Sequence, residues 1–155
     1  MNLFDELPAA EAREGYAQRE RRFGDELGAT LWGGSIYELA PGERVSPYHW
    51  HFGEEEWLLV VSGAPTLRTP EGEQALRPWD VVVFVRGAAG AHEVRNDSGE
   101  PARVVVLSTA SDPEVCVFPD SGKVGVFAGW SRTDGQRVQL MNRPEANLDY
   151  FDGET

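Results

Sequence analysis

The stretch His49-Trp50-His51-Phe52-Gly53-Glu54-Glu55-Glu56 holds two of the three histidines of the chain, followed directly by an acidic run. Side chains along a β-strand point alternately to the two faces of the sheet, so His49 and His51 would point the same way. The third histidine, His92, lies much further along the chain. This imidazole and a carboxylate, both from neighbouring strands, would complete a site with four ligands. The pattern therefore predicts a metal centre.

Short apolar runs separated by turn residues extend on both sides of this stretch. Segments such as Pro70-Glu71-Gly72 and Asn96-Asp97-Ser98-Gly99 between the runs are typical of turns. Many short strands at this spacing predict an all-β barrel or sandwich. The predicted strands are Thr30–Leu39, Val45–Phe52, Trp57–Val61, Thr66–Arg68, Gln74–Leu76, Val81–Val85, His92–Arg95, Arg103–Ser108, Glu114–Phe118 and Lys123–Phe127.

The barrel is expected over residues 28–128, with an extension at each end. Residues 1–27 are charged and contain Gly15, which would interrupt a helix. They are expected to form a short or frayed helical arm on the surface of the barrel or on a partner subunit. Residues 129–155 form a largely polar tail that is expected to pack on the barrel or on a partner subunit. Its aromatic residues include Trp130, Tyr150 and Phe151.

Composition and charge narrow the class of protein. A chain of 155 residues, 41% of them hydrophobic, is expected to form one globular domain. The formal net charge of -12 argues against nucleic acid and anionic membrane surfaces as partners. No apolar run is long enough to span a bilayer and the N-terminus is unlike a signal peptide, so a soluble cytoplasmic protein is expected. The single cysteine, Cys116, excludes an intrachain disulfide and is expected to be a buried, inert thiol.

Two segments of the chain resemble the two sequence motifs of the cupin superfamily. The pieces of the first motif, a glycine, two histidines, a glutamate and a glycine, are Gly42, His49, His51, Glu56 and Gly63. The pieces of the second are Asp80, Val81–Val85, Gly87, His92 and Asn96. The resemblance implies a double-stranded β-helix, or jelly-roll barrel, and a homodimer.

The second motif departs from the family pattern at two positions. Trp79 stands where the family has a glycine before the aspartate, and Val85 stands where it has a proline. Neither position is an expected ligand, so the departures concern the geometry of the loops. Asn96 is expected to form a turn with the residues that follow it.

The resemblance also implies which glutamate is the ligand. Six residues separate Glu56 from Gly63, as they separate the liganding glutamate from the glycine in the family motif. Strand alternation agrees, because an inward Glu56 places the apolar side chains of Leu58 and Val60 on the same face. Glu55 remains the alternative, since a bulge at Gly53 would shift the alternation by one residue.

The expected ligand set, His49, His51, Glu56 and His92, suits a divalent transition metal. Three neutral imidazoles and one carboxylate fit Fe, Mn, Ni, Cu or Zn and do not fit calcium, which binds oxygen ligands. The sequence leaves the choice among these metals open. Four protein ligands would close a tetrahedral zinc site but leave one or two open positions on an octahedral ion. Glu54 is expected to be solvated.

Two classes of function are consistent with such a site. The first is a metalloenzyme of the dioxygenase, decarboxylase or isomerase type, acting on a small organic molecule bound at the metal. The second is a non-catalytic barrel that binds a small ligand or a metal. Tyr37 and Glu38 are the candidates for a second titratable group, which acid–base catalysis requires. No arginine or lysine is expected to point inward, which argues against a phosphosugar and favours a keto or hydroxy acid, a diketone or a catechol-like compound.

Overall fold

The computed structural model describes residues 1–11, 13–129 and 136–154, so Trp130 lies outside the described residues. No helix in these residues has the length and hydrophobicity to cross a membrane.

The prediction of an all-β fold is confirmed. The strands are β1 (Arg19–Arg21), β2 (Gly33–Leu39), β3 (Trp50–His51), β4 (Glu56–Ser62), β5 (Thr66–Thr69), β6 (Gly72–Ala75), β7 (Val81–Phe84), β8 (Glu93–Arg95), β9 (Ala102–Ser108), β10 (Glu114–Phe118), β11 (Lys123–Ala128) and β12 (Val138–Asn142). The helical turns are α1 (Phe23–Glu26), η1 (Ala88–Gly90), η2 (Pro119–Ser121) and η3 (Pro144–Ala146).

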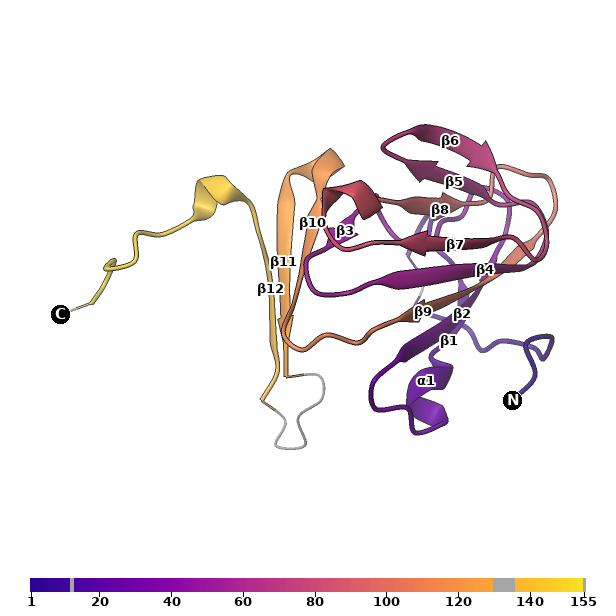
Figure 1. Cartoon of the computed structure of the whole chain (residues 1–155), viewed down its shortest axis with the longest axis horizontal. Helices are drawn as coiled ribbons and strands as arrows, with labels where there is room; N and C mark the ends of the chain where they lie inside the picture. Colours follow the sequence, from indigo (N-terminus) through magenta and orange to yellow (C-terminus); the bar gives the residue numbers. More distant parts are fainter. Residues whose placement is uncertain (12, 130–135, 155) are drawn as a thin grey trace.

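Among the described residues, the strands form antiparallel sheets of the orders β1-β2-β9-β4-β7, β12-β11-β10-β3 and β6-β5-β8. Strands that are distant in sequence are neighbours in space, because β4 lies between β7 and β9, and β3 pairs with β10. Figure 1 shows the resulting jelly-roll barrel, with β10, β11 and β12 to one side of it. Every predicted strand overlaps an observed one, although β3 is much shorter than the predicted Val45–Phe52.

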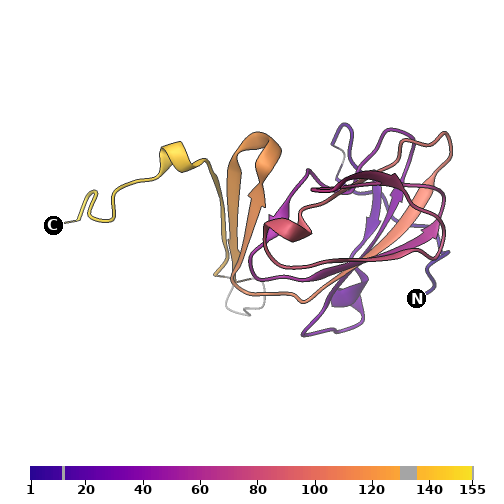
Figure 2. The same cartoon turned by 45° about the horizontal axis from the view of Figure 1, so that its top comes forward.

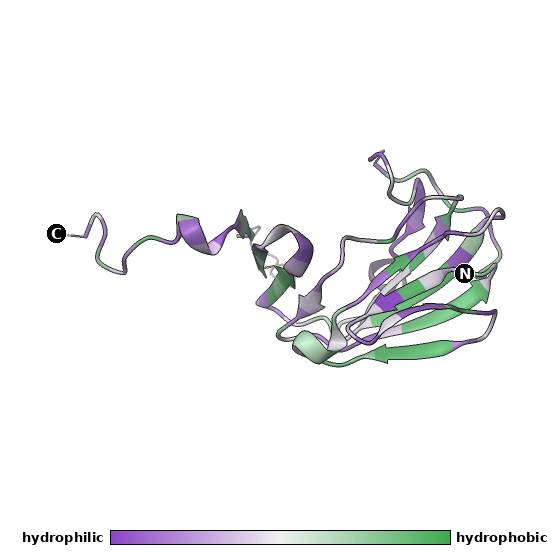
Figure 3. Cartoon of the chain, turned by 90° about the horizontal axis from the view of Figure 1, so that it is seen from above, coloured by the Kyte–Doolittle hydropathy of each residue, from purple (hydrophilic) through white to green (hydrophobic). Residues whose placement is uncertain are grey.

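Figure 2 shows the barrel from a second direction. The main hydrophobic core lies inside this barrel. Its buried residues come from two sheets, with Leu58 and Val60 on β4, Val104 on β9, Leu67 on β5 and Val94 on β8. Leu58 and Val60 are fully buried, as the alternation along this strand predicted. Burying a side chain of this size contributes about 1.5–3 kcal/mol. Figure 3 shows the hydrophobic segments concentrated along strands of the barrel.

The N-terminal residues cover part of the outer face of the five-stranded sheet. Leu7 is buried there in one cluster with Ile36 and Val105. The prediction of a helical arm is wrong for β1, which pairs with the edge of β2. The physical reason is that a segment this short has little helical stability alone, whereas the β2 edge offers backbone partners. Only the single turn α1 is helical in this part of the structure.

The C-terminal extension was expected to be a polar tail, but it contains the strand β12. This strand pairs with β11, with Leu140 opposite Val126 and Met141 opposite Gly125. All residues of β12 are exposed, so backbone pairing rather than burial holds it in place. Beyond it the chain runs away from the barrel (Figures 1 and 2), with Tyr150 and Phe151 exposed.

Candidate metal centre

Backbone pairing brings together the three histidines that are far apart in sequence. The backbones of His49 and His92 pair with each other, with N–O distances of 3.1 and 2.9 Å. His51 lies on β3, and its carbonyl accepts a hydrogen bond of 2.8 Å from the Gly87 N–H. Glu56 is the first residue of β4, opposite Phe84 of β7. The two resemblance motifs therefore meet at one end of the barrel.

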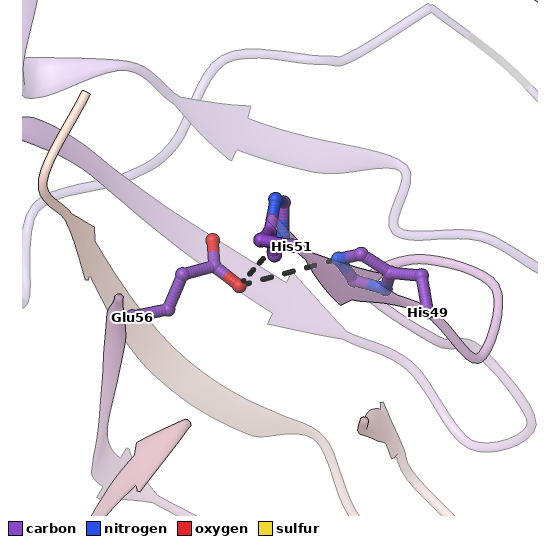
Figure 4. A group of neighbouring side chains, drawn as sticks. All are labelled: His49, His51 and Glu56. Atoms are coloured by element: carbon purple, nitrogen blue, oxygen red, sulfur yellow. Dashed lines mark ion pairs between the residues drawn. The ribbon is translucent and has the colours of Figure 1, made fainter. Parts of the chain in front are cut away.

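The side chains of these four residues converge on one point. The Oε2 atom of Glu56 lies 3.1 Å from Nε2 of His92, 3.2 Å from Nε2 of His51 and 4.0 Å from Nε2 of His49. Figure 4 shows Glu56 directed at the two imidazoles of His49 and His51. The four side chains are 6–12% exposed. The structure thus brings together all four residues predicted as ligands.

The opposite nitrogen of each ring is held by a separate partner. Nδ1 of His49 donates to the Pro47 carbonyl at 2.8 Å, and Nδ1 of His92 donates to the Gly90 carbonyl at 2.9 Å. A carbonyl can only accept, so both rings carry their hydrogen on Nδ1 and present the Nε2 lone pair to the site. The Phe84 ring stacks on His92 at 3.6 Å and fixes its orientation.

The electrostatics of the cluster favour a cation beside Glu56. Burial alone would raise the pKa of Glu56, but contacts with His51 and His92 lower it well below its ordinary value. Burial, together with repulsion from His92 and His51, lowers the pKa of His49 to about 3. Burial also acts to lower the pKa of His51, but its contacts with Cys116 and Glu56 outweigh this and raise it to about 11. A buried carboxylate among imidazoles is stabilised by positive charge next to it.

One nitrogen of the cluster is buried without a hydrogen bond among the described residues. Nε2 of His51 has no hydrogen-bond partner among the described residues, although Glu56 Oε2 lies 3.2 Å away. A buried polar atom without a partner costs free energy, and coordination to a metal ion would remove that cost. Three imidazole nitrogens and one carboxylate also match the ligands that divalent transition metals prefer. The residues present therefore fit such an ion.

The neighbouring glutamates of the acidic run do not reach the point where the Nε2 atoms meet Glu56. Oε1 of Glu55 accepts a hydrogen bond of 3.2 Å from the indole of Trp57, outside the cluster. The bulge in β4 lies between Val60 and Ser62, so it does not shift the alternation at Glu56. Glu54 was expected to be solvated, and this prediction is wrong. Its side chain is 16% exposed, and its Oε1 accepts a hydrogen bond from the Ser111 N–H because the chain folds back over it.

A small cavity of about 150 Å³ adjoins the cluster. Its lining is largely apolar and contains neither arginine nor lysine, consistent with the sequence prediction. Tyr37 lies in the lining, and burial raises the pKa of its phenol. Glu38, the other candidate for acid–base chemistry, forms ion pairs with Arg103 and Arg19 instead. The lining residues are Tyr37, Val45, Ser46, His49, Glu56, Phe84, His92, Val94 and Val106.

Two residues near the cluster were not identified from the sequence. Cys116 is buried as expected, but its Sγ lies 3.2 Å from Nδ1 of His51. Oε1 of Glu114 lies 3.3 Å from the same nitrogen. Both belong to the predicted strand Glu114–Phe118, but only its pairing with β3 reveals the contact. Asn96 is fully buried, and its Oδ1 accepts hydrogen bonds from the N–H and the hydroxyl of Ser98, as expected of a turn residue.

Comparison with known proteins identifies the family. The sequence model of the cupin domain matches residues 35–108. Over 106 residues the chain is 33% identical to the tetracenomycin polyketide synthase protein TcmJ of Streptomyces glaucescens. The matched region covers 66% of this chain and 68% of TcmJ. The chain belongs to the cupin family.

Solved structures agree with this assignment. A protein of Acidithiobacillus ferrooxidans, provisionally named a sugar phosphate isomerase, is 27% identical with a TM-score of 0.69, covering 84% of this chain and 78% of its own. A cupin-superfamily sugar phosphate isomerase of Silicibacter pomeroyi is 23% identical with a TM-score of 0.76, covering 95% of this chain and 93% of its own. The second likeness establishes the fold alone.

Proposed function

We propose that this cupin is a metal-dependent enzyme that binds a small organic molecule at a divalent ion held by His49, His51, Glu56 and His92. The observation that carries the proposal is the convergence of three imidazole Nε2 atoms on Glu56 Oε2, at 3.1–4.0 Å. The hydrogen bonds from Nδ1 of His49 and His92 support it, because they orient lone pairs toward the ion.

Residues around the ion would shape its chemistry. A divalent ion in this position supplies Lewis-acid or redox activation to an oxygen-bearing substrate. The Tyr37 phenol lines the same cavity, and its raised pKa keeps it protonated at neutral pH. It can therefore donate a hydrogen bond or a proton to a bound molecule. Val45, Val94 and Val106 make the rest of the cavity apolar and limit access of water.

The cavity favours an unphosphorylated substrate with carbonyl or hydroxyl oxygens. Recognition of a phosphate group normally uses arginine or lysine, and neither lines this cavity. The resemblance to sugar phosphate isomerases therefore does not extend to a phosphate-binding cation in this cavity, whereas the relative TcmJ is named as a polyketide synthase protein. Typical ligand pockets measure about 300–1,000 Å³. A cavity of about 150 Å³ accommodates only the metal-binding part of a larger substrate.

Metal binding can be tested with two adjacent glutamates that differ in orientation. Manganese(II) is a suitable probe because it prefers nitrogen and oxygen donors to sulfur. We expect the purified protein to bind one equivalent of Mn(II) in equilibrium dialysis, and Glu56→Gln to weaken binding by more than about tenfold. The matched control Glu55→Gln should bind as the unaltered protein does. Equal affinity of both variants and the unaltered protein would contradict the assignment of Glu56.

Turnover distinguishes an enzyme from a non-catalytic barrel. Protein loaded with Fe(II), Mn(II) or Ni(II) would be incubated with diketones, hydroxy acids and catechols, and the products followed by NMR. We expect one of these compounds to be converted, and Tyr37→Phe to lower the rate while Mn(II) affinity is unchanged. Saturable binding of a compound without conversion under any metal would support the non-catalytic barrel instead.

We also propose a homodimer in which the C-terminal extension of one chain packs on the barrel of the other. Trp57, Val83 and Leu107 are opposite one another across β4, β7 and β9, and all three are exposed. An exposed apolar row on a sheet is typical of an interaction surface. The extension carries exposed apolar side chains of its own, including Tyr150 and Phe151, which the described part of the same chain does not cover.

A further inference from the structure

A second group of metal-ligand atoms lies on the other side of the His51 ring. Nδ1 of His51 is 3.2 Å from Sγ of Cys116 and 3.3 Å from Oε1 of Glu114. Oε1 of Glu114 is buried and has no hydrogen-bond partner among the described residues. The donor atoms of the three residues lie within 4.8 Å of one another. This group shares only His51 with the site already described.

The backbone explains why these side chains meet. β10 pairs with β3 so that Cys116 stands opposite His51, and Glu114, two residues earlier, points to the same face. The Gly53 N–H donates a hydrogen bond of 3.0 Å to Oε2 of Glu114. This bond holds one oxygen of the carboxylate and directs the other toward His51. The arrangement is therefore positioned by paired strands rather than by mobile loops.

The charges around His51 also favour a cation. Glu54, Glu56 and Glu114 all have an oxygen within 3.9 Å of a nitrogen of this ring. In residues 1–11, 13–129 and 136–154, no arginine or lysine forms an ion pair with any of the three. One protonated imidazole offsets a single negative charge, and uncompensated buried carboxylates are costly. A divalent ion on each side of the ring would supply the remaining positive charge.

We propose that Nδ1 of His51, Glu114 and Cys116 bind a second divalent ion of the zinc type. A thiolate, an imidazole and a carboxylate together favour this softer class of ion. With Zn–N and Zn–O near 2.0–2.1 Å and Zn–S near 2.3 Å, neighbouring ligands on a tetrahedral ion are about 3.3–3.6 Å apart. The separations of 3.2 and 3.3 Å in the structure are close to this. Binding releases the protons of the Cys116 thiol and of Nδ1 to solvent, and the His51 ring then bridges the two ions.

The second site opens into a different cavity from the first. This cavity has a volume of about 580 Å³, and its lining includes His51, Glu54, Glu114 and Cys116 together with Arg22, Trp32 and Phe127. Three protein ligands leave the fourth position of a tetrahedral ion open, as in catalytic zinc sites. The open position takes water or the oxygen of a small ligand from this cavity. A small ligand in the large cavity would therefore bind at the second ion, and not at the ion beside the small cavity.

Cobalt(II) is the probe of choice, because Cys116 is the only cysteine in the chain. Charge-transfer absorption from thiolate to Co(II) in the near ultraviolet can then arise only from this residue. We expect the band to appear during Co(II) titration of the unaltered protein and to be absent in Cys116→Ala. Glu114→Gln should weaken Co(II) binding, measured from the band, by at least about tenfold. Glu56→Gln, which removes a ligand of the first site only, should retain the band.

The proposal shares His51 with the proposed function, but the two fail in different ways. Mn(II) binding reports on the first site, and Cys116→Ala and Glu114→Gln should both retain it, which also shows that these variants fold. Retained Mn(II) binding without a charge-transfer band in the unaltered protein would overturn the second site alone. Lost Mn(II) binding with the band present would overturn the first site alone. A band of equal strength and affinity in Glu114→Gln would remove Glu114 from the second site.

Discussion

At the scale of single residues, His51 differs from the other two histidines of the cluster. Nδ1 of His49 and of His92 is bound to a backbone carbonyl, which leaves Nε2 as the only coordinating atom. Nδ1 of His51 instead faces a thiol and carboxylates. A histidine of this cluster can therefore offer one coordinating nitrogen or two. The partner of its Nδ1 atom determines which.

The pH dependence of stability follows from His49 and His51 in the metal-free protein. The pKa of His49 is lowered to about 3, so the unfolded chain gains a proton that the native state does not, and stability is lost as pH falls below about 6.5. The pKa of His51 is raised to about 11, so its contribution is complete below about pH 6.5 and is lost as pH rises toward 11. We expect the free energy of unfolding in urea, with chelator present, to be greatest near pH 6.5. His51→Gln should reduce the alkaline loss, and a stability that rises steadily to pH 9 would contradict this explanation.

Gly90 is required by close backbone packing next to His92. A Cβ atom at this position would collide with the carbonyl of Val85, and the Gly90 carbonyl also holds Nδ1 of His92. We expect Gly90→Ala to lower the free energy of unfolding by about 1–3 kcal/mol and to weaken Mn(II) binding. Gly99→Ala is the matched control, because nothing lies within 4 Å of its added Cβ, and its effect should stay within about 0.5 kcal/mol. Equal urea midpoints for the two variants would refute the steric argument.

The four candidate ligands could be predicted from the sequence, but their surroundings could not. His49, His51 and Glu56 lie close together in sequence, so strand alternation and motif spacing were sufficient to group them with His92. The contact of Cys116 with His51 depends on the pairing of β10 with β3, and no local pattern encodes such a pairing. The same is true of Glu54, which is covered by the backbone of a distant loop.

At the scale of elements, prediction succeeded for the strands of the barrel and missed two strands, β1 and β12, which each lie at the edge of a sheet. β4 has the alternation and the apolar content that mark a buried strand. β1 and β12 are short, polar or exposed, and each exists because a neighbouring strand had a free edge. Such strands depend on backbone hydrogen bonds, which every residue type except proline can donate as well as accept. Composition therefore carried no signal for them.

The turn before β7 contains strain that a single substitution can release. Trp79 follows Pro78 at the third position of a turn closed by the bond from Asp80 N–H to the Arg77 carbonyl, and its φ is 73°. This position favours glycine, and the left-handed conformation costs other residues about 1–2 kcal/mol. Trp79 is 67% exposed, so little packing would be lost. We expect Trp79→Gly to leave thermal stability unchanged or to raise it by up to about 1 kcal/mol. Trp32→Gly, at an exposed position without positive φ, should lower stability, and a larger loss for Trp79→Gly would contradict the strain argument.

At the scale of the whole molecule, a closed barrel is joined to an extension that the barrel does not need for its core. The core cluster is drawn from the barrel strands and their flanking segments, and it contains no residue of β12 or of the segment beyond it. The N-terminal residues were also a candidate for subunit contact, but Leu7 is buried against the barrel of its own chain. The extension therefore remains the segment best placed to contact a second copy (Figure 1).

The proposed homodimer gives a direct prediction for the mass in solution. We expect multi-angle light scattering at micromolar concentration to give twice the mass of the 17.1 kDa chain. Trp57→Ser and the double variant Tyr150→Ser/Phe151→Ser should each shift the mass toward the monomer, because both sides of the contact are apolar. Phe4→Ser, which alters an exposed aromatic residue elsewhere, should stay dimeric. A monomeric mass for the unaltered protein would refute the dimer.

The most direct test of the metal centre is anomalous scattering from crystals grown with Mn(II). We expect one peak close to Nε2 of His49, His51 and His92 and to a carboxylate oxygen of Glu56, at coordination distances of about 2.0–2.3 Å. The peak should be absent from crystals of Glu56→Gln grown in the same way and present in those of Glu55→Gln. If crystals grown with excess Mn(II) showed no anomalous peak among these four side chains, the result would contradict the account.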